Sequence, residues 1–400
     1  MRLAATALFA AIVVGCGGSG GTEMQDTPLA RDLDILVERL EAIHPDPWHA
    51  VSEAEFRAAA ERLAARSGDL AEDELLVELM RLTALLGERD GHSGIFPLDP
   101  AHERRFNLYP IRLYRFSDGY FVVDAIDRPE LVGARLVSIA GRPVEEVARV
   151  VASLVPADNE ASRGARLAQW LVVEEVLDGL GFAGGEFGFE DGDQTLAAVS
   201  ADEYAAAFDD LFHPMVPQGL PERPRPAYLA RRLEEMWTAK LPEGLYLAYN
   251  VTLVDTAPLA AAVARATRPV VVDLRHNPGG DNGTYPPLLE ALRGREVVAL
   301  ISRTTFSAAG NFITDLEQAA EVTFVGEPSG GAPNHYGDPV PVELPSLGVT
   351  VQIAGVYWQK STPDDPRLAI DPDLPVELSS GDFFAGRDPV LRAGLRRALR

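Results

Sequence analysis

Lysine and cysteine are nearly absent from this chain of 400 residues. Lys240 and Lys360 are the only lysines, so a reaction that needs a lysine as general base has two candidates. Cys16 is the only cysteine, which excludes an intramolecular disulfide bond. Lysine and arginine together number 36 against 60 acidic residues, and the net charge of −24 leaves little to neutralise phosphates. We therefore expect no nucleic-acid partner.

Metal-binding and cofactor-binding patterns are also missing from the sequence. It has no H-E-x-x-H, no cysteine cluster and no calcium loop, so we expect neither a metal nor a cofactor. After the first residues it contains no apolar run long enough to cross a membrane. Its composition, 46% hydrophobic and 24% charged, is typical of globular proteins, and its length predicts two or three folded units.

The first residues predict a targeting signal. A short positive start at 1–2 is followed by an apolar stretch at 3–14, too short to span a bilayer, and then by V-V-G-C. This pattern resembles a bacterial lipoprotein signal, which implies that residues 1–15 are removed and that a lipid on Cys16 anchors the protein in the cell envelope. The alternative is an ordinary secretory signal that is cleaved nearby. Residues 16–28 have the composition of a flexible tether.

Two regions of different pattern follow the tether. Residues 29–100 predict a helical region, because apolar residues recur at three- and four-residue steps. Residues 107–200 shift toward strands, with alternating or apolar runs separated by turns. Within them, G-A-R-L-V-S-I-A-G-R-P-V-E-E-V resembles the strand, turn and helix of a PDZ domain, so we expect 107–200 to be a PDZ-like domain. The segment 165–181 predicts a single helical stretch.

Residues 201–400 are expected to form the last domain. Residues 201–240 predict a linker and a helix over Y-L-A-R-R-L-E-E-M-W. From residue 244 onward, strand and helix patterns alternate, and V-V-V-D-L and V-V-A-L-I are short apolar runs of the kind that form buried strands. This alternation predicts an α/β fold with a mostly parallel sheet covered by helices.

Ser307 stands at the start of a predicted helix in R-T-T-F-S-A-A-G-N-F. A serine at this place can simply cap the helix. However, N-P-G-G (277–280) directly follows a buried strand of the same sheet, where backbone N–H groups can point at a ligand. Acyl transfer needs this combination of a nucleophile and oxyanion donors. Because Gly-rich loops beside parallel strands also bind phosphates, the spacing alone leaves both kinds of site open.

Four motifs in order resemble the tail-specific, or C-terminal processing, serine peptidases. They are D-L-R-H-N-P-G-G (273–280), T-F-S-A-A (305–309), V-G-E-P-S-G-G (325–331) and D-P-D-L-P-V (371–376). H-P-D-P, R-D-G-H-S and G-R-D-P-V-L are similar to segments of one bacterial branch, so the resemblance covers nearly the whole mature chain. It implies the ββα-repeat fold of Clp protease and crotonase, with a PDZ-like insertion.

The same resemblance assigns the first catalytic roles. It implies that Ser307 is the nucleophile. It also implies an oxyanion hole formed by the N–H of Ser307 or Ala308 together with that of Gly279 or Gly280. The relatives of this family include the core of tricorn protease and interphotoreceptor retinoid-binding protein.

The general base departs from the usual family pattern. Most processing peptidases place a lysine after the third motif, where this chain has Ala332, so a Ser–Lys dyad of the usual form is excluded. Histidine is then the best base, because its pKa lies nearest neutrality. His92 in D-G-H-S resembles the base of the tricorn-like branch, in which a serine precedes the histidine, whereas here Gly91 precedes it and Ser93 follows. The alternative base is His335, three residues beyond Ala332.

The resemblance also implies an acid downstream of the nucleophile that orients the base. Asp365 in T-P-D-D-P-R occupies the comparable place. Asp364 beside it and Asp338 are rivals for this role. An Asp-Asp-Pro run is also ordinary turn chemistry, so a purely structural role stays open.

Together these features predict a lipid-anchored serine endopeptidase of the cell envelope that cleaves polypeptides through an acyl-enzyme on Ser307. The PDZ-like segment would capture an extended peptide by strand addition. Two alternatives use the same fold: a catalytically silent binding protein, as the retinoid-binding relatives are, and an esterase or amidase for small acyl substrates. Covalent labelling by a fluorophosphonate would separate the silent protein from the two hydrolases.

Overall fold

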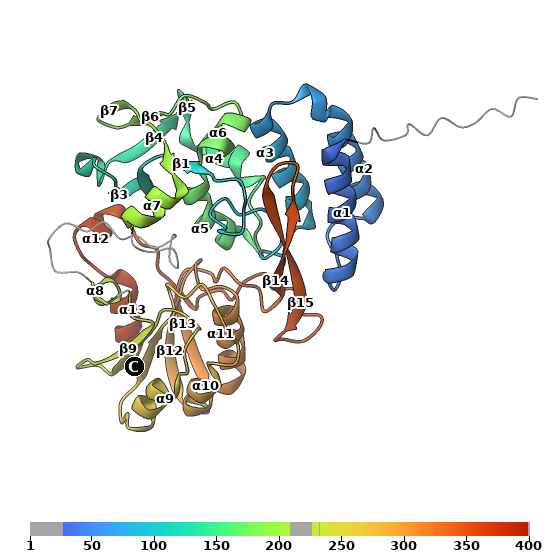
Figure 1. The fold of residues 1–400 in the computed structure, drawn as a ribbon. Coiled ribbons are helices and arrows are strands. Elements are labelled where there is room, and N and C mark those ends of the chain that lie inside the picture. The colour runs from blue at the N-terminus through green and yellow to red at the C-terminus, as the bar shows by residue number, and fades with distance from the viewer. Residues whose placement is uncertain (1–26, 209–225, 232, 399–400) are drawn as a thin grey trace, which may run out of the picture.

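The computed structural model describes residues 27–208, 226–231 and 233–398 (Figure 1). The predicted signal at 1–15, Cys16 and nearly all of the tether lie outside the described residues. In Figure 1 the N-terminal helices and an antiparallel sheet form one half of the molecule, and a parallel sheet with its helices forms the other. A long hairpin runs between the two halves. The candidate catalytic residues lie on segments from both halves.

The N-terminal half begins with helices whose first turns are capped and whose apolar residues lie on one face. They are α1 (Pro28–Ile43), α2 (Glu53–Arg66) and α3 (Glu72–Thr83), with the 3-10 turns η1 (Ser67–Asp69) and η2 (Ala84–Leu86). Thr27 accepts a hydrogen bond from the Ala30 N–H at the start of α1, and Ser52 forms a capping box with Glu55 before α2. None of the helices in the described ranges is both long and apolar enough to cross a membrane.

An antiparallel sheet follows, as the alternating pattern predicted. Its strands run in the order β2 (Ile111–Phe116), β3 (Gly119–Ala125), β4 (Arg135–Ile139), β6 (Glu186–Phe189) and β7 (Gly192–Thr195), and β5 (Arg142–Pro143) pairs with β4. The short strands β1 (Asn107–Leu108) and β8 (Val199–Ser200) pair with each other. The connecting helices are η3 (Pro129–Leu131), α4 (Val144–Ala152), α5 (Glu160–Trp170) and α6 (Glu174–Gly179).

The single helix predicted over 165–181 is wrong, because the chain breaks between α5 and α6. At the break, the Val172 carbonyl accepts a hydrogen bond from the Tyr109 N–H, and Val173 bridges to Leu108. Both valines are fully buried. Pairing with a strand therefore overrides the helical pattern of the sequence.

One hydrophobic core joins the N-terminal helices to this sheet. It includes Leu36 of α1, Leu76 of α3 and Phe187 of β6, together with Ile353 of the long hairpin, and all four side chains are fully buried. The helical region and the sheet are thus packed as one body. Their division into a region at 29–100 and a PDZ-like domain at 107–200 stays a prediction.

The second half is built on a mostly parallel sheet, which confirms the predicted α/β class. The strand order is β16 (Leu374–Pro375), β13 (Glu321–Gly326), β12 (Glu296–Ile301), β11 (Val270–Asp273), β10 (Leu245–Tyr249) and β9 (Met236–Lys240). Neighbours are parallel except β9, which is antiparallel to β10. Every residue of β11 is buried, as a continuous apolar run predicts for a central parallel strand.

Helices cover both faces of the parallel sheet. One face carries α9 (Ala257–Ala264), α10 (Pro286–Leu292) and α11 (Ala308–Ala319), and the other carries α13 (Pro389–Ala398). Alternate residues of β11 separate the two cores, because Val270 and Val272 contact the first set of helices and Val271 contacts the second. The remaining helices are α7 (Ala201–Phe208), α8 (Ala227–Ala230) and α12 (Ser380–Phe384). Residues of α8 and α12 pack against β2 and β3.

The helix predicted over Y-L-A-R-R-L-E-E-M-W is also wrong. Its first residues form only α8, and its end begins strand β9, in which Trp237 pairs with Ala248 of β10 and is buried. The residues of β9 alternate between more and less buried positions, as an edge strand does. Burial of the tryptophan against the sheet decides the structure here.

A long hairpin was not foreseen in the sequence analysis. It consists of β14 (Asn334–Leu344) and β15 (Val349–Gln359), which pair along their whole length. Gln352 exchanges two backbone hydrogen bonds with Gly94, and the Tyr336 N–H donates to the Arg89 carbonyl. The hairpin therefore holds the loop around His92 against the loops that follow β12 and β13.

Candidate active site

Ser307 is the residue directly before α11, on the turn that follows β12. Its backbone has φ 53° and ψ −127°, a region that favours glycine, and such strain in a non-glycine residue collects at functional sites. Its side chain makes no capping hydrogen bond to α11. The half-buried hydroxyl is thus not used as a helix cap.

The side chain that faces this hydroxyl belongs to His92. Nε2 of His92 lies 3.0 Å from Oγ of Ser307, although the two residues are 215 positions apart in the sequence. The imidazole also stacks on the ring of Phe306, with 4.6 Å between the ring centroids. The distance from Nε2 to Oγ is within the reach of a base that takes a proton from a nucleophile.

The surroundings of His92 favour its neutral form. Burial is the largest cause that holds the pKa of His92 well below its ordinary value, and the positive charges of His335 and Arg166 act in the same direction. The backbone of Tyr336 opposes them only in part. At neutral pH the ring is therefore uncharged and can accept a proton from Ser307.

Neither lysine of the chain approaches Ser307. Ala332 stands in the place of the usual lysine and is fully buried. Lys360 binds the Asp315 carboxylate at 2.9 Å and the Tyr285 hydroxyl at 2.8 Å. Lys240 lies at the end of the edge strand β9. Histidine is thus the available base in this structure.

Gly279 touches the nucleophile but does not offer a free N–H. A Cβ at Gly279 would lie 2.5 Å from Cβ of Ser307, and its φ is +109°, so only glycine fits here. Its N–H donates to Oδ1 of Asn277 at 3.0 Å. No hydrogen bond between described residues uses the N–H of Gly280 or of Ala308. Of the four predicted oxyanion donors, Gly279 is thus committed, and Gly280 on one side and Ser307 or Ala308 on the other remain.

His335 lies behind His92 and not beside Ser307. It is fully buried, its Nδ1 is 2.9 Å from the carbonyl oxygen of Ala332, and its ring is nearly parallel to that of His92 at 5.8 Å. No hydrogen bond joins it to Ser307 within the described chain. The alternative base thus packs against the first one.

The structure does not bring Asp365 to His92. The Asp365 carboxylate accepts hydrogen bonds from the Ser361 hydroxyl and the Arg367 guanidinium, at 2.6 and 2.8 Å, and these interactions, led by that with Arg367, hold its pKa well below the ordinary value. Asp364 and Asp338 are exposed. Nδ1 of His92 makes no hydrogen bond to a carboxylate among the described residues, and the group that acts on its ring from this side is the Tyr336 backbone. Ser93 does not reach that ring either, since its hydroxyl accepts a hydrogen bond from the Ala354 N–H.

Two charged residues next to the site were missed in the sequence analysis. Asp158 is fully buried and accepts hydrogen bonds from the N–H groups of Gly91 and Ala332, at 2.7 and 3.1 Å. Arg166 donates to the Gly91 carbonyl at 2.8 Å. The only sequence signal for Asp158 is its place before Asn159, the N-cap of α5. It marks a helix start and gives no hint of a contact with residue 91.

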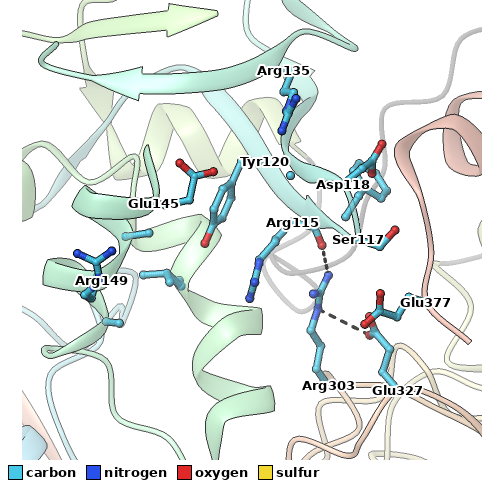
Figure 2. Close-up of a pocket in the computed structure, with 15 residues that line it drawn as sticks. Arg115, Ser117, Asp118, Tyr120, Arg135, Glu145, Arg149, Arg303, Glu327 and Glu377 are labelled. Carbon is cyan, nitrogen blue, oxygen red and sulfur yellow. Dashed lines mark hydrogen bonds and ion pairs between the residues drawn. The ribbon is translucent and has the colours of Figure 1, made fainter. Parts of the chain in front are cut away.

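A cavity lies between the β2–β3 hairpin, α4 and loops of the parallel sheet, and Ser307 is not among its lining residues (Figure 2). It has a volume of about 560 Å³. Arg303, four residues before Ser307, reaches into it, bonds to the Arg115 carbonyl and lies 3.8 Å from the Glu327 carboxylate. The cavity is thus lined in part by the turn that also carries Ser307.

The arrangement around Ser307 suits acyl transfer to a hydroxyl. A nucleophile at a helix N-terminus, a neutral imidazole within hydrogen-bond distance and two uncommitted N–H groups are the parts that this chemistry requires. No group of three or more histidine, cysteine, aspartate or glutamate side chains in the described ranges is arranged to hold a metal ion.

Comparison with known proteins gives matches at the level of structure. No protein-family model and no curated protein sequence matches the chain. The structure of mature CPAF complexed with lactacystin matches with a TM-score of 0.63 at 12% identity, over 93% of this chain and 97% of that one. A second structure of mature CPAF gives 0.61 at 13%, over 93% and 96%. The photosystem II D1 C-terminal processing protease gives 0.41 at 12%, over 94% and 98%.

The two CPAF structures fix the fold of this chain over nearly its whole length. The predicted likeness to the C-terminal processing peptidases is thereby confirmed for the fold. At 12% identity a shared fold does not assign residue roles or an activity. Those have to come from the geometry around Ser307.

Proposed function

We propose that this chain, which has the fold of mature CPAF, is a serine peptidase that cleaves polypeptides through an acyl-enzyme on Ser307, with His92 as general base. The observation that carries the proposal is the 3.0 Å contact between Nε2 of His92 and Oγ of Ser307. The depressed pKa of His92 supports it, because the base is neutral at neutral pH. The strained backbone of Ser307 supports it as well.

The proposed reaction begins with attack of the Ser307 hydroxyl on the substrate carbonyl while its proton passes to Nε2 of His92. The N–H groups of Ala308 and Gly280 stabilise the oxyanion, and the helix N-terminus of α11 adds to this effect. The imidazolium then gives its proton to the leaving amine. Water, activated by the same ring, releases the acyl group.

The substrate path is proposed to include the cavity of Figure 2. Residues of β4 and α4, which belong to the segment that resembles a PDZ domain, line part of it, and that segment is the one proposed to capture an extended peptide by strand addition. Four arginines and four acidic residues line it, so the cavity offers both charges to the polar groups of a peptide; they are Arg115, Arg135, Arg149, Arg303, Asp118, Glu145, Glu327 and Glu377. A polypeptide held there would extend toward the turn that carries Arg303 and Ser307.

The place of action is proposed to be the bacterial cell envelope. The support is the signal-like start of the sequence and Cys16, the only cysteine, at its end. A lipid on Cys16 would hold the protein to a membrane, and the tether to residue 28 would let the folded part reach polypeptides near that surface. The charge of −24 makes nucleic acid an unsuitable partner.

The experiment that tests the activity compares Ser307→Ala with the wild type. We expect the variant to lose casein hydrolysis and fluorophosphonate labelling, because the hydroxyl is the nucleophile in both. Its melting temperature should stay within about 2 °C, since the hydroxyl makes no cap bond. Full hydrolysis by the variant would exclude Ser307 as nucleophile.

Two histidine variants complete the test. We expect His92→Ala to lose activity about as heavily as Ser307→Ala, because a nucleophile and its base fail as a unit. His335→Ala should still be labelled, since no hydrogen bond joins His335 to Ser307. An inactive His335→Ala with a normal His92→Ala would reverse the assignment of the base. Cleavage of a short ester but not of casein would make the protein an esterase.

A further inference from the structure

The loop that carries His92 is held from both sides at one peptide group. The Gly91 N–H donates to Oδ1 of Asp158 at 2.7 Å, and the Gly91 carbonyl accepts from Nη1 of Arg166 at 2.8 Å. Asp158 lies in the loop between α4 and α5, and Arg166 lies within α5, so both are far from His92 in the sequence. The direction of the residue before the base is therefore fixed by a carboxylate and a guanidinium.

Asp158 also explains why glycine precedes His92. A Cβ at Gly91 would lie 2.8 Å from Oδ1 of Asp158 and 3.1 Å from Cζ of Phe306. The carboxylate thus occupies the space that a serine side chain would need in the tricorn-like pattern. A buried acid from another segment stands where that pattern has a hydroxyl.

The second oxygen of Asp158 is bound to the loop beside the nucleophile. Oδ2 accepts a hydrogen bond from the Ala332 N–H at 3.1 Å. The glycines before Ala332 donate their N–H groups to the Thr305 carbonyl at 3.0 and 3.1 Å, and a Cβ at Gly331 would lie 3.4 Å from the Ser307 nitrogen. One carboxylate therefore connects the loop of the base to the loop that packs against Ser307.

His335 completes this connection. With Nδ1 as the donor, it binds the Ala332 carbonyl at 2.9 Å, so that the Ala332 peptide is held at its N–H by Asp158 and at its oxygen by His335. The His335 ring then stacks behind His92 at 5.8 Å. His335 thus supports from behind the ring that faces Ser307.

A fully buried carboxylate is costly unless it is compensated. Burial raises the pKa of Asp158, while the charges of His335 and Arg166 and its two N–H donors act against this rise. Burial in turn lowers the pKa of Arg166 to about 10, which leaves the guanidinium charged at neutral pH. The Asp158 carboxylate is therefore compensated by positive neighbours and by two N–H donors, which belong to the two catalytic loops.

We propose that Asp158 is a positioning residue that sets the distance between His92 and Ser307, the part that the sequence resemblance gives to Asp365. It acts through the peptides of Gly91 and Ala332 and does not touch the substrate. The inference rests on the proposed function. It also assigns the residue that aligns the base, which the resemblance placed elsewhere in the chain.

The test is the Asp158→Asn variant, with Asp365→Asn as the matched control. Asparagine has one oxygen and one NH2 group, so it cannot accept from both N–H groups, and the His92 loop should shift relative to the Ser307 loop. A misplacement of about 1 Å costs on the order of 10²-fold in rate. We expect kcat on a peptide to fall by on the order of 10²-fold, with KM within about twofold. Asp365→Asn should keep kcat within about threefold, since that carboxylate binds Arg367. A wild-type kcat in Asp158→Asn would overturn the proposal.

A second background separates positioning from general loss of structure. In His92→Ala, the added change Asp158→Asn should lower the residual rate of fluorophosphonate labelling by no more than about threefold, because most of the effect of Asp158 passes through the base and only the remainder through the Ala332 loop. A further large loss in the double variant would show that Asp158 supports the fold and would overturn the proposal. If Asp158→Asn does not fold, Gly91→Ala takes its place, because its Cβ displaces the same peptide while the carboxylate stays. A normal kcat in Gly91→Ala would equally overturn it.

The two levels of proposal fail in different ways. Full activity in Ser307→Ala and His92→Ala would remove the proposed function. Loss of activity in those two variants together with a normal Asp158→Asn would leave the peptidase standing and remove only the role of Asp158.

Discussion

At the scale of single residues, the backbone of Ser307 links stability to function. Its φ of 53° and ψ of −127° are disfavoured for any residue with a Cβ, and the side chain returns no hydrogen bond to α11. Strain of this kind costs about 1–3 kcal/mol per residue. A Cβ added at Gly279 would lie only 2.5 Å from Cβ of Ser307, so the glycine loop packs closely against this turn. The turn therefore holds the hydroxyl toward His92 at the expense of stability.

A glycine at this position should make the protein more stable and inactive. We expect Ser307→Gly to raise the free energy of unfolding by about 1 kcal/mol, because relief of strain exceeds the entropy that glycine adds to the unfolded chain. Chemical denaturation measures this change, and Ser307→Ala, which keeps the Cβ, is the control and should be nearly neutral. A glycine variant less stable than the alanine variant would show that the turn is not strained.

The pH dependence of the rate follows from the surroundings of His92. Only the neutral ring accepts the proton of Ser307, so kcat/KM falls as the pH drops through the pKa of His92 in the free enzyme. Burial first, and then the charges of His335 and Arg166, lower that pKa. We therefore expect the acidic limb of a kcat/KM profile below about 6.5, the ordinary histidine value.

The control for this profile is His335→Ala. Removing that charge should move the acidic limb to higher pH, toward the ordinary value, while leaving a measurable rate. A wild-type limb near or above neutrality would show that His92 is well solvated or that another group is the base.

At the scale of elements, the last helix is attached to the sheet through one buried charge cluster. Asp388 precedes α13, accepts a hydrogen bond from the Leu391 N–H at 2.9 Å, and binds Arg275 through both carboxylate oxygens at 2.9 and 3.0 Å. Arg275 also binds Asp273 at the end of β11. Burial opposes ionisation of Asp273, but Arg275 prevails and keeps its pKa below the ordinary value. The cluster joins α13 to the strand that leads into the Gly279 loop.

Asp388→Ala should destabilise the protein strongly. The change removes a helix cap and leaves Arg275 with one of its two acids, so we expect a loss of about 3 kcal/mol in the free energy of unfolding. Urea denaturation measures it. Glu296→Ala, which removes the exposed pair of Glu296 with Arg397 of the same helix, should cost less than about 0.5 kcal/mol. Equal losses in the two variants would show that the cluster is not specially stabilising.

Elements with a strong local pattern were predictable, and those decided by distant contacts were not. The capped N-terminal helices and the buried run of β11 follow from spacing and apolarity. The break between α5 and α6 depends on Tyr109, and β9 depends on pairing with β10. The hairpin β14–β15 contains Pro339 and Pro341, which hide its strand pattern. Tertiary pairing overrides local propensity in each of these cases.

The residues of the candidate site also differ in whether a local pattern or a distant contact decides their position. Ser307 lies on a helix start beside a Gly-Gly loop, which its motif predicts. The meeting of His92 with Ser307 follows from the resemblance, because no local pattern shows which distant segments touch. Asp158 could not be found in the sequence, since a single aspartate before a helix cap is indistinguishable from ordinary turn chemistry. Asp365 is the reverse case. Its place in the sequence suggested an acid that orients His92, but in the structure its carboxylate binds Arg367.

At the scale of the whole molecule, attachment to a membrane is proposed to depend on a single residue. We expect Cys16→Ser to move the protein from the membrane fraction to the soluble fraction, because one residue carries the whole lipid anchor. Fractionation after a high-salt wash, followed by immunoblotting, measures this. The activity of the released protein serves as the control and should match the wild type. A variant that stays with the membranes would exclude the lipoprotein anchor.

His92 precedes Ser307 by 215 positions, so during protein synthesis the base is made before the nucleophile. Synthesis proceeds from the N-terminus at roughly 5–20 residues per second, so the base leaves the ribosome about 10 to 40 s before the nucleophile. Ala332 and the hairpin that presses the His92 loop into place emerge later still. Under the proposed function, the active site can therefore assemble only after most of the chain has been synthesised, because the base and the nucleophile lie on segments that are made at different times.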